Sequence, residues 1–487
     1  MNLSLLVAVP LVTVLAVLCC KGRQAIRWVA LAGTTAQLVL SVCLLVLYLD
    51  ARADGDTGIM VFESRYVWFA PLHIFYHVGV DGISVAMILL TALVMEAAVL
   101  VSWNVEKMTK EFFVLLLFMG AGAYGFFLSL DLFTLFFFLE LSVIPKFLLI
   151  GIWGSGKKEY SAMKLALMLM SGSALVLVGL LGVFYNAGSF NLLLDAFTGM
   201  TPAAQRVFFP FVFVGFGIFS ALFPFHTWVP DGHSSAPTPA SMFLAGISMK
   251  LGGYGCLRVA TFLMPIAARE YAPIIICLST IAIVYGAFAT MMQTDLKYIN
   301  AYSSISHCGF VLLGIGMLTT TALTGAVMQM VSHGLMTALL FASIGMIYDR
   351  THTRMVAKLG GLLKIMPFIS TVFVLGGLCS LGLPGLSGFA AEITVFMGSW
   401  ENAIVGYRVA TILACASIVI TAVYILRAVG QTIFGPVREP SYNGLPDARW
   451  NERYAAGLLI LGILIVGVAP FYLSDLLRPN IQTILHH

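Results

Sequence analysis

Fourteen runs of mainly apolar residues follow one another along the 487-residue chain, and they constrain its fold more than any other feature. A helix needs about 20 such residues to cross the hydrocarbon core of a bilayer. The connections between the runs are short, so they leave no room for an inserted soluble domain. The runs lie at residues 3–20, 28–48, 79–103, 112–130, 132–152, 161–185, 207–225, 238–262, 272–292, 300–318, 321–348, 366–400, 405–433 and 455–475. The pattern predicts an all-α, polytopic membrane protein with about 14 transmembrane helices.

The composition agrees with this fold class and excludes several others. Hydrophobic residues make up 60% of the chain and charged residues only 10%, whereas a soluble domain carries about 25% charged residues. A soluble enzyme, a disordered protein or a nucleic-acid binder would need the charged surface that is missing here. The net charge of +4 indicates no acidic partner, so we expect contact with the lipid bilayer and none with nucleic acid.

The sequence offers no motif for a redox centre or a metal. The eight cysteines include no CxxC pair and no Cys/His cluster, so neither an iron–sulfur cluster nor a zinc site is expected. No GxGxxG string follows a strand, which argues against a dinucleotide site. We therefore expect no cofactor and no metal in this chain.

Lysine and arginine in the loops predict how the chain is oriented. Loops after odd-numbered runs carry 16 of these residues, and the opposite side carries five, with Arg408 at a helix start. The odd loops should face the cytoplasm, which places both termini outside. The first run has neither a basic segment before it nor a small-residue cleavage site, which favours a first membrane helix over a removed signal. We expect a bacterial inner membrane protein.

A few ionisable residues remain inside the apolar runs. Such residues cost several kcal/mol in hydrocarbon and usually mark an ion or proton path. They are the bases Lys146, Lys164, Lys250 and Arg258, the acids Glu140 and Glu392, and the histidines His307 and His333. Lys164 and Arg258 lie near helix ends. For these two, a side chain that extends to the membrane interface explains the charge at least as well as a role in an ion path.

The other buried charges favour proton transfer. Glu140 follows a long apolar stretch, so desolvation and a nearby cation would control its protonation; the alternative is a neutral carboxyl with a local hydrogen bond. Lys250 lies mid-helix, about two turns too deep to reach the interface. The imidazoles of His307 and His333, on successive helices, suit a relay, although a lone histidine is more often a hydrogen-bonded core residue.

Two helices should be broken at membrane depth. Pro224 lies in FSALFPFHTW, between Phe219 and Trp228, and Pro384 and Gly385 precede Glu392 in LGLPGLSGFAAE. Broken helices are tolerated where they line a hydrated cavity. Because helices 7 and 12 are five apart, the breaks predict two inverted five-helix repeats, helices 4–8 and 9–13.

The repeats divide the chain into four parts. Helices 1–3 occupy residues 1–110, and the first repeat occupies residues 111–265. The second repeat occupies residues 266–433, and a C-terminal loop and helix 14 occupy residues 434–487.

Several strings resemble one family. They are LELSVIP with GIWG, FPFHTWVPDGHSSAPTPASMFLAGISMKLGGYG, QTDLKYINAYSSISHCGFVLLGIG, SHGLMTALLF, YDRTHTR and LGLPGLSGF, in this order. The sequence is similar to the antiporter-like, proton-pumping membrane subunits of respiratory complex I over about residues 79–430. Within that family, YDRTHTR (Tyr348–Arg354) and the number of runs most resemble the chain M group, the counterpart of mitochondrial subunit 4.

The resemblance implies roles for individual residues. Glu140 matches the helix-5 glutamate of proton transfer, and Lys250 matches the helix-8 lysine of the central axis. His307 and His333 match the region that links two half-channels, and Glu392 matches the helix-12 glutamate of the outward half-channel. Pro224 and Pro384 match the family's helix breaks.

One position departs from the family pattern. The lysine that the family usually has on helix 7 is replaced by Phe219, so the usual partner of Glu140 is absent. Lys146 follows Pro145, where the family tends to have an apolar residue, and we expect it to replace part of the lost charge. A six-residue offset is about 9 Å along an ideal helix, so direct pairing depends on the local geometry. The alternative is a lysine with no role in pumping; Lys164 is a second candidate.

The resemblance further implies a non-redox subunit of NADH:quinone oxidoreductase, not catalytic by itself. NADH, flavin, iron–sulfur clusters and quinone would belong to partner subunits, and other complex I membrane subunits, antiporter-like chains included, would flank the chain. A cation/proton antiporter subunit, a subunit of a membrane-bound hydrogenase and a structural spacer that has lost pumping remain alternatives. A sodium ion would need several clustered oxygen ligands, and because none is evident in the sequence, the proton is favoured.

Overall fold

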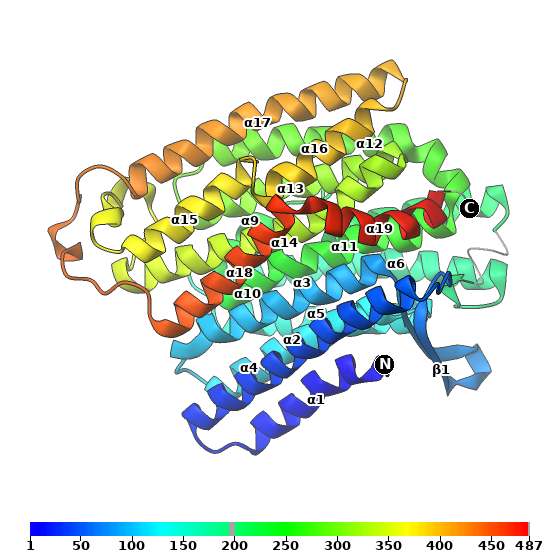
Figure 1. Cartoon of the computed structure of the whole chain (residues 1–487), viewed down its shortest axis with the longest axis horizontal. Coiled ribbons are helices and arrows are strands. Elements are labelled where there is room, and N and C mark those ends of the chain that lie inside the picture. Colours follow the sequence, from blue (N-terminus) through cyan, green and yellow to red (C-terminus); the bar gives the residue numbers. More distant parts are fainter. Residues whose placement is uncertain (194–199, 486–487) are drawn as a thin grey trace.

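The computed structural model describes residues 1–193 and 200–485, and its long helices run roughly along one direction in a single bundle (Figure 1). The first half contains α1 (Ser4–Cys19), α2 (Arg23–Ala53), α3 (Gly82–Val101), α4 (Thr109–Leu128), α5 (Leu132–Trp153), α6 (Lys158–Ala187), α8 (Pro202–Phe219), α9 (Trp228–Ser235), α10 (Thr238–Phe243), η3 (Leu244–Ser248), α11 (Met249–Gly255) and η4 (Cys256–Thr261). The second half contains α12 (Pro265–Met291), α13 (Leu296–Met317), α14 (Thr320–Thr351), α15 (Pro367–Ser380), α16 (Ser387–Trp400), α17 (Val405–Thr432), α18 (Trp450–Val468) and α19 (Pro470–Leu485).

The helices confirm the predicted fold class. Within the described residues, ten helices are long and apolar enough to cross a membrane, and α1 and α15 are shorter apolar helices. Every one of the fourteen predicted ranges contains helix. The number of crossings and the division into two inverted repeats stay predictions.

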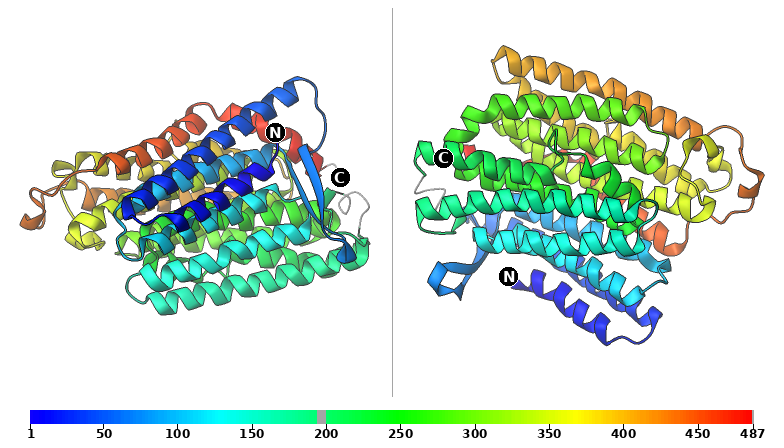
Figure 2. Two further views of the ribbon diagram at one scale, coloured as in Figure 1. Left: turned by 90° about the horizontal axis from the view of Figure 1, so that it is seen from below. Right: turned by 180° about the vertical axis from the view of Figure 1, so that it is seen from behind.

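Helix α14 forms the centre of the molecule. Its whole apolar window is buried, and it contacts α3, α13, α16 and α18. By contrast, α2 and α17 bury only a minor part of their most apolar stretch. They lie on opposite flanks of the bundle (Figures 1 and 2). Polar groups on α14 are therefore shielded from lipid by a full layer of helices, whereas α2 and α17 present apolar side chains outward.

Both predicted breaks are confirmed. Helix α8 ends at Phe219, and α9 begins only at Trp228, with Pro224 between them. The interruption is stabilised by the hydroxyl of Ser220, which donates to the carbonyl of Met249 at 3.0 Å. In the second break α15 ends at Ser380 and α16 begins at Ser387. Gly382 and Gly385 lie between them with φ of +77° and +92°, values that favour glycine.

The segment around Lys250 is not a regular α-helix. The π-helical segments η3 and η4 precede and follow the short helix α11. A π-helical turn is often found at functional sites, because it turns side chains away from the ordinary helical positions. Close packing against α8 holds this segment: a Cβ on Gly252 would lie 2.5 Å from the carbonyl oxygen of Phe216.

A two-stranded hairpin, which was not predicted, lies between α2 and α3. Strands β1 (Val61–Phe69) and β2 (Ile74–Val80) pair antiparallel, with Arg65 opposite His77. It lies at the end of the bundle that holds both termini (Figure 1). The sequence analysis treated this stretch as a loop, although its β-branched and aromatic residues are typical of strands.

Candidate functional site

Four of the predicted site residues meet in the core, where α11, α13, α14 and α16 come together. They are Lys250, His333, His307 and Glu392, and each side chain is almost completely buried. Along the sequence, Lys250 and Glu392 are 142 positions apart, with the two histidines between them. They form one continuous line that begins at Lys250.

Lys250 begins the line. Its ammonium lies 2.7 Å from Nδ1 of His333 and also donates to the carbonyl of Ala245 in η3. The π-helical geometry of η3 presents this carbonyl to the lysine five residues later, which gives the buried cation a second acceptor. The other ring nitrogen of His333, Nε2, is buried and has no hydrogen-bond partner within residues 1–193 and 200–485.

The two histidines form the middle of the line. The ring centroids of His333 and His307 are 5.4 Å apart. Nε2 of His307 lies 3.1 Å from the hydroxyl of Ser380, at the end of α15. Its Nδ1 lies 3.2 Å from the amide nitrogen of Gln329. The His307 ring is therefore held by α14 on one side and by the second helix break on the other.

Glu392 ends the line. Its Oε1 lies 3.4 Å from Nδ1 of His307. The carboxylate packs against the break itself, since a Cβ on Gly382 would lie 2.8 Å from Oε2 of Glu392. A side chain at position 382 would compete with the carboxylate for this space. The break thus provides both the room and the neighbours for a buried acid.

Nδ1 of His307 has two neighbours with opposite requirements. The amide of Gln329 donates to Nδ1 only if that nitrogen carries no proton, whereas the carboxylate of Glu392 accepts from Nδ1 only if it does. Either protonation state of the ring therefore has a partner at this nitrogen. Such an arrangement allows a proton to arrive at or leave His307 without leaving a polar group unpaired.

Glu140 is not part of this line. It lies half-buried on α5 beside exposed Phe137 and Ile144, and its Oε1 has no hydrogen-bond partner in the described parts of the chain. Lys146 is completely buried; its ammonium donates to the hydroxyl of Ser142 at 3.0 Å. The two charges lie within electrostatic reach of each other, although they form no direct ion pair among the described residues.

Position 219 has no access to solvent or lipid. Phe219 is fully buried, and its Cβ would be 2.8 Å from a Cβ added at Gly252 on the helix that carries Lys250. The ring thus fills a place beside the segment that carries Lys250. An apolar residue here removes a cation from the neighbourhood of the line.

Two further bases have acidic partners. Lys164 forms a 2.7 Å ion pair with Asp231 of α9. The sequence allowed Arg258 to extend to the membrane interface, but the structure shows otherwise. Arg258 is buried and paired with Asp81, the residue that caps α3. A buried partner explains this arginine better than a helix-end position does.

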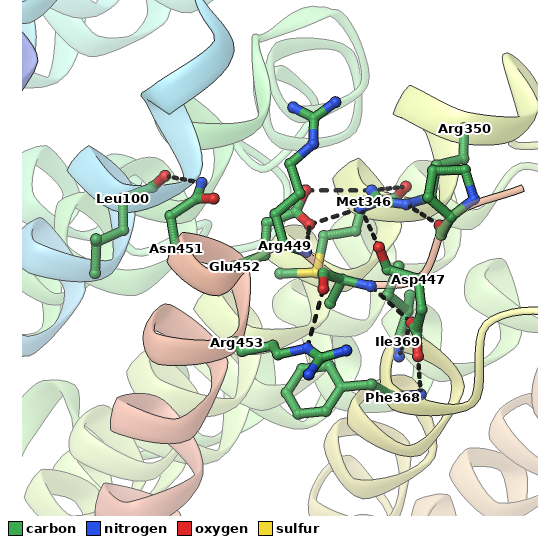
Figure 3. Close-up of polar contacts among 12 residues, drawn as sticks. Leu100, Met346, Arg350, Phe368, Ile369, Asp447, Arg449, Asn451, Glu452 and Arg453 are labelled. Carbon is green, nitrogen blue, oxygen red and sulfur yellow. Dashed lines mark hydrogen bonds and ion pairs between the residues drawn. The ribbon is translucent and has the colours of Figure 1, made fainter. Parts of the chain in front are cut away.

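A cavity of about 630 Å³ lies at the end of the bundle opposite the termini. Its lining includes Lys297, Asp349, Arg350 and Glu452, and Figure 3 shows Arg350 and Glu452 joined at its edge. Lys297, which the sequence analysis counted among the loop residues, is instead buried in the first turn of α13. Its ammonium donates to the carbonyl of Ala236 at 2.7 Å.

His233 lies near both the cavity and the line of four. It is completely buried on α9, and neither ring nitrogen has a hydrogen-bond partner in the described ranges. Both Lys297 and Lys250 lie within its electrostatic reach. The imidazole therefore lies near a lysine next to the cavity and near the lysine that begins the line.

Sequence reasoning missed several buried ionisable groups, among them Asp81, Glu96, His233 and Lys297. Asp81 and Glu96 fall inside the run predicted at residues 79–103, so a stricter search of that run for charges would have found them. His233 and Lys297 lie close to run boundaries, where sequence alone does not separate a loop from a buried first turn. Within the described residues, no group of three or more His, Cys, Asp or Glu side chains is placed to hold a metal ion.

Comparison with known proteins identifies the family of the chain. Residues 129–421 match the transmembrane family described as NADH:quinone oxidoreductase/Mrp antiporter. The chain belongs to this family. It is 35% identical to NAD(P)H-quinone oxidoreductase chain 4-2 of Synechocystis, with 96% of this chain and 89% of the relative covered. It is 32% identical to NADH-quinone oxidoreductase subunit M of Rickettsia prowazekii, with 99% and 98% covered.

Solved structures of the family share the fold. The match to a chain of respiratory complex I from Thermus thermophilus with bound NADH has a TM-score of 0.91 at 25% identity, covering 100% of this chain and 99% of the other. A chain of the Mrp complex from Dietzia matches with a TM-score of 0.84 at 20% identity, covering 99% of both. The second likeness concerns the fold alone.

Proposed function

We propose that this chain is a proton-translocating membrane subunit of NADH:quinone oxidoreductase. The observation that carries the proposal is the continuous buried line of Lys250, His333, His307 and Glu392. Relatives with the names chain 4 and subunit M, similar over almost the whole length, support this assembly. A cation/proton antiporter subunit is the second candidate, favoured by the shared fold of the Mrp complex.

Proton transfer along the line uses the direct contacts at its two ends and crosses a gap between the two imidazole rings, which form no hydrogen bond with each other among the described residues. The ammonium of Lys250 gives a proton to Nδ1 of His333, which it already contacts. His333 then releases a proton from Nε2 toward the ring of His307, and Nδ1 of His307 passes one to Glu392. Each step moves one proton between neighbouring groups, and each new charge biases the next transfer electrostatically.

Protons reach Lys250 from the cavity at the predicted cytoplasmic end. Lys297 borders this cavity, and His233 lies within electrostatic reach of both lysines. An imidazole with two unpaired nitrogens accepts a proton on one side and donates one on the other. Lys297 and His233 thus connect the cytoplasmic side with the line.

The remaining parts of the machinery belong to partner subunits. We place NADH, flavin, iron–sulfur clusters and quinone there, with other membrane subunits, antiporter-like chains included, on both flanks. Glu140 lies on a half-exposed face of α5. The charge of a flanking subunit therefore influences whether its carboxyl is protonated. Lys146 supplies part of the positive charge that Phe219 lacks.

Proton pumping in variants of the assembled complex tests this function. Lys250→Met should abolish proton uptake into vesicles or reduce it severalfold per NADH oxidised, because the line then loses its first proton carrier. Glu140→Gln should lower the same ratio. The measurement is the ratio of pumped protons to oxidised NADH in reconstituted vesicles.

Glu159→Gln, an exposed carboxyl on the first turn of α6, is the matched control and should keep the normal ratio. Normal pumping in both Lys250→Met and Glu140→Gln would refute the assigned path. Membrane extracts without NADH-dependent activity, together with sodium/proton exchange by the isolated assembly, would favour the antiporter candidate.

A further inference from the structure

A buried carboxyl lies outside the line, among the N-terminal helices. Glu96 of α3 is only 1% exposed and contacts α2, at the flank of the bundle opposite α17 (Figures 1 and 2). No step of the proposed function uses it. Because an ionisable group at membrane depth is expensive to keep, Glu96 calls for an explanation of its own.

Glu96 lies inside the hydrocarbon region. Trp28 of α2 packs against Trp103 and Trp450, with ring centroids 5.1 Å and 6.1 Å away, and such aromatic groups are typical of a membrane interface. Thr34 lies six residues, or about 9 Å of helix, beyond Trp28. Glu96 bonds to Thr34, so it lies about as deep and has no direct access to bulk water.

Two hydroxyls hold the carboxyl. Oε2 of Glu96 lies 2.5 Å from the hydroxyl of Thr34, and Oε1 lies 2.8 Å from that of Thr35. The same hydroxyl of Thr34 also lies 3.1 Å from the carbonyl of Leu31. A hydroxyl has one hydrogen, so Thr34 donates either to this carbonyl or to Glu96, and not fully to both.

This choice lets both protonation states of Glu96 be satisfied. When the carboxyl is ionised, Thr34 donates its hydrogen to the carboxylate. When the carboxyl is protonated, it donates to the oxygen of Thr34, and Thr34 turns its hydrogen to the carbonyl of Leu31. The contacts of a merely structural carboxylate would favour one state only, whereas these contacts support a proton that comes and goes.

A small cavity, lined mainly by apolar groups, lies beside Thr34, the partner of the carboxyl. It measures about 10 Å³, and its lining includes Thr34, Gln37 and Tyr124; a single water needs about 10–15 Å³ on this scale. The side chains of Gln37 and Tyr124 are buried and interact with each other. Tyr124 lies within electrostatic reach of Glu96. These two groups therefore place polar atoms near the carboxyl, beside a space at the lower limit for one water.

We infer that Glu96 is a second proton-binding site, separate from the line of four, which takes up and releases a proton during turnover. Thr34 adapts to the two states, and Gln37 and Tyr124 connect the site to the interior of the N-terminal helices. Two hydroxyl oxygens and one carboxylate meet at this site. A single carboxylate with neutral oxygens would attract a sodium ion as well, so the test must separate the two ions.

Infrared difference spectra of the assembled complex, reduced by NADH minus oxidised, test the site. A carbonyl band of a protonated carboxyl that shifts in D₂O should be present in the wild type and absent from Glu96→Gln. Glu111→Gln, an exposed carboxyl on α4, is the matched control and should keep the band. Thr34→Val retains the carboxyl but removes the hydroxyl that hydrogen-bonds to it. The loss of this hydrogen bond should move the carbonyl band to higher frequency.

Each outcome decides the matter. An unchanged carbonyl band in Glu96→Gln overturns the inference. A wild-type band that disappears when sodium replaces potassium also overturns it, because that result assigns the site to sodium. If Glu96→Gln fails to assemble, an unshifted band in Thr34→Val overturns it. The result is independent of the line of four, because Lys250→Met reports on pumping and leaves the Glu96 band in place.

Discussion

At the scale of single residues, the balance of buried charge distinguishes this chain. A fully buried phenylalanine occupies position 219, where the family resemblance predicts a lysine, and a fully buried lysine occupies position 146. The six-residue offset from Glu140 excludes a close pair on a regular helix. Even so, the ammonium of Lys146 remains within electrostatic reach of the carboxyl, and at low dielectric such a separation still gives a substantial interaction.

Replacing this lysine tests its influence on Glu140. Lys146→Met should lower the ratio of pumped protons to oxidised NADH severalfold, because the ionised carboxylate loses the cation that stabilises it. Pumping in reconstituted vesicles and the infrared band of Glu140 are the measurements. Lys164→Met removes a lysine that is already paired with Asp231 and should have a smaller effect. An unchanged ratio and band in Lys146→Met would contradict the compensation.

At the scale of elements, the C-terminal loop fastens several helices at one end. Arg350 of α14 donates to both carboxylate oxygens of Glu452 in α18, at 3.2 and 2.7 Å, and to the backbone of the preceding loop (Figure 3). Asp447 of that loop accepts from the first backbone N–H groups of α15. Asn451 binds the carbonyl of Leu100 in α3. This clasp, centred on Arg350, joins α3, α14, α15 and α18 at the edge of the cavity.

Breaking the clasp should destabilise the chain. Arg350→Gln leaves Glu452 as a buried carboxylate without its cation, which costs on the order of 3 kcal/mol in known cases. A lower unfolding temperature of the purified chain in detergent is the expected result. Arg206→Gln, which breaks the exposed pair with Glu270, should leave the temperature unchanged. Equal temperatures for wild type and Arg350→Gln would show that the clasp contributes no stability.

At the scale of the whole molecule, the two termini lie at the same end of the bundle, together with the β1–β2 hairpin (Figures 1 and 2). A topology with an even number of crossings, as predicted, places both termini at one end; the number of crossings itself stays a prediction. The loops with the excess of lysine and arginine lie at the other end. Orientation in the bilayer remains a prediction from the charge of the loops.

Accessibility of the termini tests that orientation. Tags on both ends should be cleaved by a protease added outside intact spheroplasts, because both are expected on the periplasmic side. A tag inserted in the loop after α17, near Tyr442, should stay protected until the membrane is opened. Protection of both terminal tags in intact cells, with cleavage of the loop tag, would reverse the orientation.

The sequence alone was enough for the membrane class, the positions of the helices and both breaks. Long apolar runs and prolines act locally, so the residues that carry these signals lie next to their effects. Lys250, His307, His333 and Glu392 were also identifiable, because a charge or an imidazole inside an apolar run is conspicuous. Their order along the line was not, since it depends on how four distant helices pack.

Only the tertiary structure decided which buried charges have partners. Arg258 meets Asp81, Lys297 borders the cavity, and Glu96 meets two hydroxyls of α2, and each contact joins segments far apart in the chain. The cost of burying a charge depends on the groups that surround it in space, and an apolar run does not reveal them. The sequence could therefore show where charges enter the membrane, whereas packing determined which of them are paired and which lie next to another buried ionisable group.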